Sequence, residues 1–391
     1  MEAQGITVPL DLPDLRVLAQ RVTATALEVE VQRATTSAVC PQCGHRTAKR
    51  HDIRPRRLLY QPVGERTVTL ILHRRRFRCW PCDRVFTEPD TVAGPRRRLT
   101  GRLRQQLGRQ GCTQPVTVVA ARHGVSPATV GRAVTEYAAP RLADRAATPV
   151  VQLGIDDFSL RRGRRYATGL HDLVRRTVVD VVEGRTAAVA QAALERLPAP
   201  EVVQVVSMDM ARAYRAAVQV VLPDAVIVVD KYHVIARIHK ALAQVWGRLL
   251  RGRARDDPVR TDGRLVFTAR ETLTEEQRAR LGAVLWQHPD LRRAWLLKED
   301  FRRWYRDATA PDARLELRAW LRTAVHASNL PEFAALTGMF REWQEEILAY
   351  FTHRVTQALV EGHNTRAKCF QRQAYGYRRV ESLRTRLMVA T

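Results

Sequence analysis

Leu153-Gly154-Ile155-Asp156-Asp157-Phe158 is the stretch of sequence on which the expected fold depends, because an apolar run ends there in a pair of carboxylates. A second run, Val202–Asp209 (VVQVVSMD), is rich in β-branched residues and closes on an acid. A third stretch, Val360–Lys368 (VEGHNTRAK), places Glu361 in a segment with helical character. β-Branched runs favour strands. The pattern therefore predicts two strands and one helix, each carrying an acidic side chain.

These acids matter chemically if the fold brings Asp156, Asp209 and Glu361 together. Converging carboxylate oxygens are hard ligands suited to Mg²⁺ or Mn²⁺, and two such ions assist the cleavage of phosphodiesters. The alternative is that each is an ordinary strand-end or surface carboxylate. Asp157 is the rival of Asp156 as first ligand, since adjacent strand residues face opposite sides of a sheet.

The composition is that of a basic globular protein. With 391 residues and 45% hydrophobic content, the chain is long enough for two or three domains. Its net charge of +25 indicates a polyanionic partner such as nucleic acid. No apolar run approaches the roughly 20 residues of a membrane span, and no basic leader precedes an apolar segment at the N-terminus. We therefore expect a cytoplasmic protein with no membrane partner.

Two C-x-x-C pairs, Cys40/Cys43 and Cys79/Cys82, predict a four-cysteine zinc site in a domain covering residues 1–95. The spacer between them (44–78) is longer than in most zinc ribbons, and Thr67–Leu72 within it resembles a strand. Four unconnected thiols are the alternative. Cys112 and Cys369 stand alone and are expected to be packing residues.

Arginine runs flank the cysteines and are predicted to contact phosphate. A solvated charged face is the alternative. The runs are Arg54, Arg56 and Arg57; Arg74, Arg75, Arg76 and Arg78; and Arg96, Arg97 and Arg98.

Residues 96–147 are predicted to hold a helix-turn-helix. One helix covers Val116–Arg122, Gly124 permits the turn, and Ser126 caps a second helix that runs from Pro127 to about Tyr137. Thr129 and Arg132 are the predicted DNA contacts. A short αα-hairpin without DNA contacts is the alternative, and Ala138–Thr148 is expected to be a linker.

Residues 148–235 alternate strands and helices in the order of a ribonuclease-H-like core. The expected elements are strands at Val150–Phe158, Arg165–Leu170 and Thr177–Val182, a helix at Ala187–Arg196, a strand at Val202–Met208, a helix at Arg212–Leu222 and a strand at Ala225–Val229. Asp230 and His233 follow the last strand as a D-x-x-H element. It is expected to orient DNA or a catalytic carboxylate, unless His233 only bonds the backbone at a helix start.

An α-helical insertion is predicted over 236–350, with a break at Asp256–Gly263. Six tryptophans fall there, and tryptophans at helical spacing are more often core than base-stacking platforms, so one exposed ring at most is expected to touch DNA. These are Trp246, Trp286, Trp295, Trp304, Trp320 and Trp343. The core is predicted to resume over 351–391.

On the final helix, one face is expected to carry an acid followed by polar and basic groups, as befits a metal ligand beside phosphate contacts. It comprises Glu361, Asn364, Lys368 and Arg372. Gly362 weakens the helix next to the acid, which close approach of backbone or substrate would explain.

The motifs together resemble those of the ISL3 family of bacterial insertion-sequence transposases over nearly the whole chain. The resemblance rests on the two cysteine pairs, the helix-turn-helix, GIDDFSLRRGRRYAT (154–168), MDMARAY (208–214), VDKYH (229–233), EGHNTRAK (361–368) and RQAYGYR (372–378). By position, Asp156, Asp209 and Glu361 match the family's metal-binding D-D-E triad, and Asp230 and His233 match its D-x-x-H element. Arg164, Gln357 and Ala367 depart from the family pattern, which has His, Asn and Ile there.

The resemblance implies an α+β multidomain transposase with the parts described above. Its expected reaction is Mg²⁺-dependent (or Mn²⁺-dependent) nicking and strand transfer, with Zn²⁺ in the N-terminal domain. The expected partners are double-stranded DNA of the element's terminal inverted repeats and target DNA, bound by a homodimer or higher oligomer at the bacterial nucleoid. The alternative is a non-catalytic, sequence-specific DNA-binding regulator derived from such an enzyme.

Overall fold

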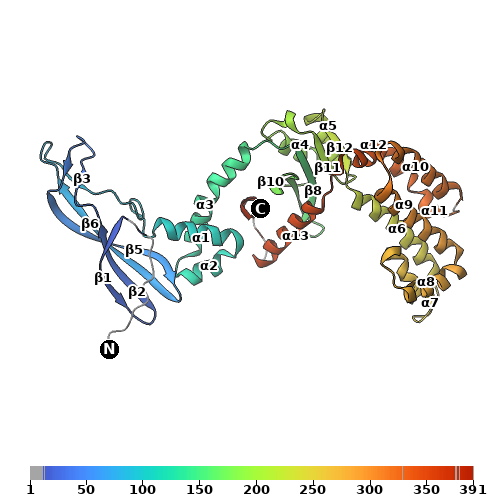
Figure 1. Ribbon diagram of the computed structural model, residues 1–391, viewed down its shortest axis with the longest axis horizontal. Helices are drawn as coiled ribbons and strands as arrows, with labels where there is room; N and C mark the ends of the chain where they lie inside the picture. The colour runs from blue at the N-terminus through green and yellow to red at the C-terminus, as the bar shows by residue number, and fades with distance from the viewer. Residues whose placement is uncertain (1–11, 13, 328, 375–376, 378, 391) are drawn as a thin grey trace. The chain divides into compact units, whose positions relative to one another are not determined.

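The computed structural model describes residues 12, 14–327, 329–374, 377 and 379–390, and divides them into two compact units (Figure 1). One unit ends at Ala143, and the other runs from Asp144 to Val389. The aromatic and basic turn after Arg372 falls largely outside the described residues, since Tyr375, Gly376 and Arg378 are not among them.

The N-terminal unit is built on a five-stranded sheet in the order β1-β2-β6-β5, with β7 paired to β6, and a small sheet of β3 and β4. The strands are β1 (Leu15–Val22), β2 (Ala26–Arg33), β3 (Ala38–Val39), β4 (Arg46–Thr47), β5 (Arg50–Val63), β6 (Arg66–Arg78) and β7 (Val85–Thr87).

A long hairpin explains the wide spacing of the cysteine pairs. β5 and β6 pair antiparallel, and Arg50 at the start of β5 lies opposite Phe77 at the end of β6. The 35 residues between the cysteine pairs are therefore folded back on themselves, which returns Cys79 to the vicinity of Cys43. The predicted strand at 67–72 is confirmed as the first half of β6, whereas β5 was not predicted.

The helices α1 (Gly101–Thr113) and α2 (Val116–His123) and most of α3 (Pro127–Ala147) complete this unit; the last turn of α3 falls in the second unit. Gly124 has φ +62° between α2 and α3, and the Ser126 hydroxyl accepts the Thr129 N–H at 3.2 Å, so the predicted turn and cap are confirmed. The linker predicted after Tyr137 is wrong, because α3 continues to Ala147 through Pro140. The Ala-rich composition of this segment favours helix.

The second unit contains a five-stranded sheet in the order β10-β9-β8-β11-β12. β8, β9 and β10 are antiparallel neighbours, whereas β11 runs parallel to both β8 and β12. Its elements are β8 (Gln152–Arg161), β9 (Arg165–Asp172), β10 (Thr177–Glu183), α4 (Ala187–Leu194), β11 (Val205–Met208), α5 (Arg212–Val221) and β12 (Val226–Val229). Each predicted strand and helix of this segment is confirmed, with small shifts at the ends.

Strand register explains why two distant acids become neighbours. Ile155 of β8 pairs with Met208 of the parallel strand β11, so Asp156 and Asp209 each follow a paired residue at the same edge of the sheet. Gly154 then allows helix α13 (Ala358–Gln373) to approach β8, because a Cβ there would lie 2.9 Å from Val360 Cγ2. This close contact carries Glu361 to the same edge.

Helices occupy the rest of the second unit, as predicted for 236–350. They are α6 (Lys231–Leu249), α7 (Pro258–Thr261), α8 (Glu275–Gln287), α9 (Pro289–Asp307), α10 (Ala310–Arg322), α11 (Pro331–Ala334), α12 (Thr337–His353), α13 and α14 (Val380–Ala390).

Tryptophans pack this helical region, as expected. Phe301 lies 5.1 Å from Trp304 and 4.8 Å from Trp320 between ring centroids, and all three rings are buried. Trp343 is also buried, whereas Trp286 is 78% exposed. One hydrophobic core runs from the sheet through these helices.

None of the helices among the described residues is both long and apolar enough to cross a membrane.

Candidate functional site

The four paired cysteines converge in the N-terminal unit. Their Sγ atoms all lie within 4.8 Å of one another, with Cys40 and Cys82 3.7 Å apart and Cys43 and Cys79 3.4 Å apart. A tetrahedral zinc site with Zn–S bonds of about 2.3 Å places its sulfurs about 3.8 Å apart. The cluster therefore fits Zn²⁺, as the sequence predicted.

The two cysteine turns are built alike. The N–H of Cys40 donates to the His45 carbonyl, and the N–H of Cys79 donates to the Arg84 carbonyl five residues on. The stacked rings of Phe77 and Phe86 lie beside the thiols in a small core. The backbone N–H of Cys43 lowers the pKa of Cys40 to about 6, whereas burial raises that of Cys79 to about 12.

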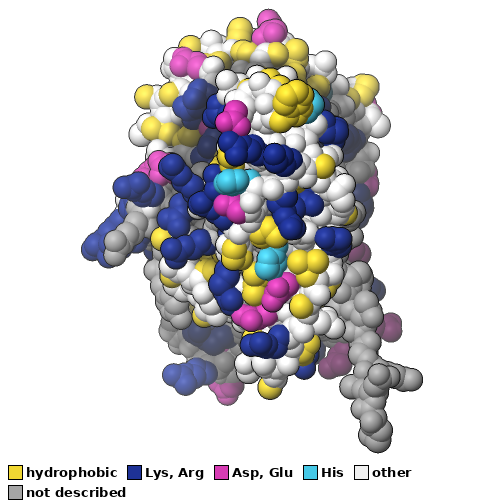
Figure 2. Space-filling view, turned by 90° about the vertical axis from the view of Figure 1, so that its left-hand side faces the viewer, with side chains coloured by type: hydrophobic (Ala, Val, Ile, Leu, Met, Phe, Trp, Pro, Cys, Tyr) yellow, Lys and Arg dark blue, Asp and Glu magenta, His cyan; other side chains and the backbone are white. Residues whose placement is uncertain are grey.

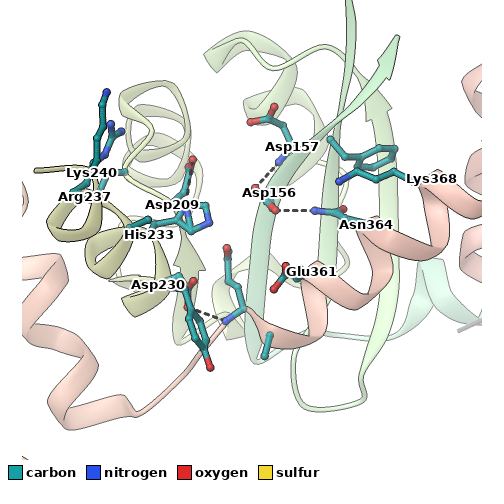
Figure 3. Close-up of a pocket in the computed structure, with 16 residues that line it drawn as sticks. Asp156, Asp157, Asp209, Asp230, His233, Arg237, Lys240, Glu361, Asn364 and Lys368 are labelled. Carbon is teal, nitrogen blue, oxygen red and sulfur yellow. Dashed lines mark hydrogen bonds and ion pairs between the residues drawn. The ribbon is translucent and has the colours of Figure 1, made fainter. Parts of the chain in front are cut away.

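A second site lies in the other unit, where the three predicted acids line one cavity of about 630 Å³ (Figure 3). Asp156 comes from β8, Asp209 from the end of β11, and Glu361 from the first turn of α13. Asn364, Lys368, Asp230 and His233 line the same cavity. Residues separated by as many as 212 positions are thus brought together.

Asp156 is fixed by two hydrogen bonds. Its Oδ2 accepts from Asn364 Nδ2 at 2.7 Å, and its Oδ1 accepts the N–H of Asp157 at 2.8 Å. The Asp157 carboxylate points away from Asn364 and lies 3.9 Å from Arg185 (Figure 3). Both acids line the cavity, but only Asp156 is hydrogen-bonded to the helix that carries Glu361.

Asp209 faces His233, whose Nδ1 lies 3.9 Å from Asp209 Oδ2. The other oxygen, Oδ1, is buried and has no hydrogen-bond partner among the described residues. Asp230 Oδ1 instead accepts the backbone N–H of Gln357 at 3.1 Å. A buried carboxylate oxygen without a hydrogen-bond partner is a suitable ligand for a hard cation.

Gln357 connects the elements that carry the three acids. Its Nε2 donates to the carbonyl of Ile155 on β8 at 2.9 Å and to that of Ser207 on β11 at 2.7 Å. It also precedes α13, and its carbonyl accepts the Glu361 N–H at 3.1 Å. This role could not be predicted from the sequence, because the contacts of Gln357 lie 150 and 202 positions away.

Burial and neighbouring charges raise the pKa of Asp156 and Asp209 at this cavity. The pKa of Asp156 rises to about 6, chiefly because of burial, and the charges of Asp209 and Asp157 add to the effect. Burial also raises the pKa of Asp209, although the charge of His233 opposes it. The carboxylates are therefore held together at an electrostatic cost that a divalent cation would relieve.

The acids are not packed as closely as the thiols. Among the described residues, only the cysteine cluster has three or more ligand atoms all within 4.8 Å of one another. The carboxylates share a cavity wall but remain apart.

Two basic side chains that were not predicted from the sequence line this cavity. Arg237 and Lys240 on α6 line it, on the opposite side from Lys368 of α13 (Figure 3). Their spacing of four and then three residues from His233 was the available signal, since these positions share one helix face. Arg372, by contrast, is exposed and does not line the cavity, although it was predicted on the same face as Glu361.

The predicted DNA contacts of the N-terminal unit lie together. Thr129 and Arg132 line a cavity of about 400 Å³ with Arg96, Arg97 and Arg98, and Arg132 is exposed. Lys and Arg side chains cover much of the face drawn in Figure 2, with fewer Asp and Glu among them. This arrangement suits a polyanion.

Some arginines of the predicted phosphate-binding runs are structural instead. Arg75 is buried and pairs with Glu88 at 2.7 Å, so its predicted phosphate contact is wrong. Arg56 pairs with Asp90 and also donates to the Gly94 carbonyl. A run of arginines in the sequence does not show which of them form ion pairs with acidic residues in the fold.

Comparison with known proteins defines the class. Residues 153–387, more than half of the chain, match a family described as transposase of the ISL3 group. Residues 36–82 match a zinc finger of the transposases of IS204, IS1001, IS1096 and IS1165. The chain therefore belongs to the ISL3 transposase family, as its motifs had indicated.

Individual relatives agree with this assignment. The chain is 28% identical over 360 residues to the transposase for insertion sequence element IS1001 of Bordetella parapertussis, covering 90% of this chain and 88% of that protein. It is 29% identical over 259 residues to the transposase for insertion sequence element IS1557 of Mycobacterium tuberculosis, covering 59% and 58% respectively.

Proposed function

We propose that this protein is a D-D-E transposase that binds the terminal inverted repeats of its element, nicks DNA there and joins the freed strand to target DNA. The observation that carries the proposal is that Asp156, Asp209 and Glu361, supplied by two parallel strands and one helix, line the same cavity. The sheet order with three antiparallel strands followed by two parallel ones supports a ribonuclease-H-like core.

Asp156, Asp209 and Glu361 would hold Mg²⁺ or Mn²⁺. An ion held by these three carboxylates would supply the charge that activates the attacking oxygen and stabilises the leaving oxygen of a phosphodiester. Asn364 keeps Asp156 oriented toward α13, and His233 stands beside Asp209. Asp156 is the better first ligand than Asp157, because it is tied to the helix that carries Glu361.

The remaining parts receive roles that fit this reaction. The zinc domain (1–95) and the helix-turn-helix (96–147) would bind the terminal repeat, with Thr129 and Arg132 as base or backbone contacts. The core (148–235 and 351–391) would catalyse the reaction, and the helical insertion (236–350) would interrupt it in the sequence. Paired cleavage of two ends favours a homodimer or higher oligomer, and the DNA substrate places its action at the bacterial nucleoid.

Strand cleavage of a duplex that contains the element's end tests the proposal. The wild type should nick it when Mg²⁺ is present, and Asp156→Ala, Asp209→Ala and Glu361→Ala should each lower the rate by at least about 10³-fold. DNA binding by the three variants should remain, which separates the proposal from a non-catalytic regulator. Wild-type-like cleavage by any two of them would end the assignment.

A further inference from the structure

A second cavity adjoins the acid cavity and shares part of its wall. It measures about 320 Å³ and is lined by residues of α6 and of the helical insertion. Met210, Arg237 and Lys240 line both cavities. A continuous surface therefore leads from the carboxylates, along α6, to the insertion.

One face of α6 forms this surface. His233, Arg237, Lys240 and Gln244 follow one another at intervals of four, three and four residues, so their side chains lie on the same side of the helix. The opposite face, with Val234 and Ile238, is buried in the core. From His233 to Gln244 the helix rises about 16 Å, a length over which one strand of duplex DNA carries four or five phosphates.

The acids that line the second cavity form ion pairs with arginines that lie outside this cavity. Glu332 pairs with Arg248 at 3.1 Å, and Glu342 pairs with Arg215 at 2.8 Å and with Arg212. Neither of the arginines that hold Glu342 lines the cavity, nor does Arg248. The carboxylates therefore do not compete for the two cations on α6.

Arg237 and Lys240 have no ion-pair or hydrogen-bond partner among the described residues, and both side chains are exposed. Two unpaired positive charges therefore lie on the wall that the two cavities share. A phosphate chain that enters a cavity lined by several carboxylates needs such charges, since the acids alone repel it.

We infer that the α6 face from His233 to Gln244 is a binding surface for the phosphates of a DNA strand, with Arg237 and Lys240 as its charged contacts. The strand runs from the acid cavity toward the helical insertion, on the side opposite Lys368. The insertion is thereby part of the DNA-binding surface as well as a packed helical domain. The inference rests on the proposed function only in taking DNA as the polyanion.

Salt-dependent binding tests the charged contacts. A fluorescently labelled random-sequence duplex serves as the probe, in buffer without divalent ions, so that cleavage plays no part. Arg237→Gln with Lys240→Gln should weaken binding several-fold and reduce the slope of log affinity against log salt by about 1.8, or about 0.9 for each lost phosphate contact. Arg292→Gln is the matched control, because Arg292 is exposed on α9 and lines neither cavity.

Crosslinking tests the path of the strand in the otherwise intact chain. A photo-crosslinking amino acid in place of Gln244 should attach to the labelled duplex, and the same group in place of Arg292 should not. An unchanged salt slope in the double variant, together with no crosslink from position 244, would overturn the inference. A reduced salt slope and a crosslink from position 244, in a wild-type protein that does not cleave end-containing DNA with Mg²⁺, would refute the transposase chemistry and leave the α6 surface standing.

Discussion

The thiol cluster and the acid cavity are both candidate metal sites, yet they are built in opposite ways. The four sulfurs already lie at the separations of a closed tetrahedral site, on two similar turns backed by a small aromatic core. The acids line an open cavity of about 630 Å³ and remain further apart, and burial raises the pKa of Asp156 and Asp209 among them. A closed four-ligand site suits a structural metal, whereas an open and electrostatically costly one suits a metal that meets a substrate.

The largest expected difference between the two sites concerns metal removal. Dialysis against metal-free buffer should abolish strand cleavage, because the acid cavity is open to solvent, while about one zinc per chain should remain by atomic absorption. Adding Mg²⁺ or Mn²⁺ should restore cleavage. Cleavage that persists without divalent ions would show that the reaction needs no metal at the acid cavity.

Breaking the thiol cluster should affect the other unit little. Cys79→Ser removes a buried ligand, so zinc should be lost and the N-terminal unit destabilised. Six of the seven tryptophans lie in the second unit, so tryptophan fluorescence should report almost unchanged folding there. Cys112→Ser is the control, since this buried thiol lies outside the cluster and its loss should leave the zinc content unchanged.

Gln357 allows a smaller, more selective disturbance of the acid cavity. Gln357→Leu keeps the size of the side chain but leaves the Ile155 and Ser207 carbonyls without their donor. We expect cleavage to fall by about 10- to 100-fold through misplaced acids, with DNA affinity preserved. Gln373→Leu, at an exposed position on the same helix, is the control variant. Equal cleavage rates for the two variants would show that Gln357 does not position the acids.

The smallest expected effect is a gain in stability. The pKa of Asp156 is raised from 3.8 to about 6 in the fold, so the fold prefers the neutral acid and loses stability as the pH rises from about 4 through 6. At pH 7.5 without metal, Asp156→Asn should therefore raise the free energy of unfolding of the second unit by on the order of 1–2 kcal/mol. Urea titration followed by tryptophan fluorescence measures it, and Mg²⁺ should stabilise the wild type more than the variant.

The sequence predicted most of the catalytic segment because its signals are local. β-Branched and apolar runs indicated the strands, and Asp156 and Asp209 directly follow the apolar segments of two of them. The convergence of Asp156 and Asp209 then follows from the pairing of Ile155 with Met208. Strand β5 was missed because its alternation is masked by charged residues such as Arg54 and Arg57.

Features that depend on distant partners could not be predicted. The hydrogen bonds of Gln357 span 150 and 202 positions, and the burial of Arg75 depends on finding Glu88 across a strand pair. A linker was predicted over Ala138–Thr148, but α3 continues through Pro140 to Ala147, where the Ala-rich sequence favours helix.

Anomalous diffraction from crystals soaked in Mn²⁺ is the sharpest test of the proposed catalytic metal site. We expect a manganese peak in the second unit within bonding distance of Asp156, Asp209 and Glu361, and a separate zinc peak among the four cysteines. Zinc at the cysteines with no manganese at the three carboxylates, under conditions in which the protein cleaves DNA, would rule out a metal site formed by these three acids.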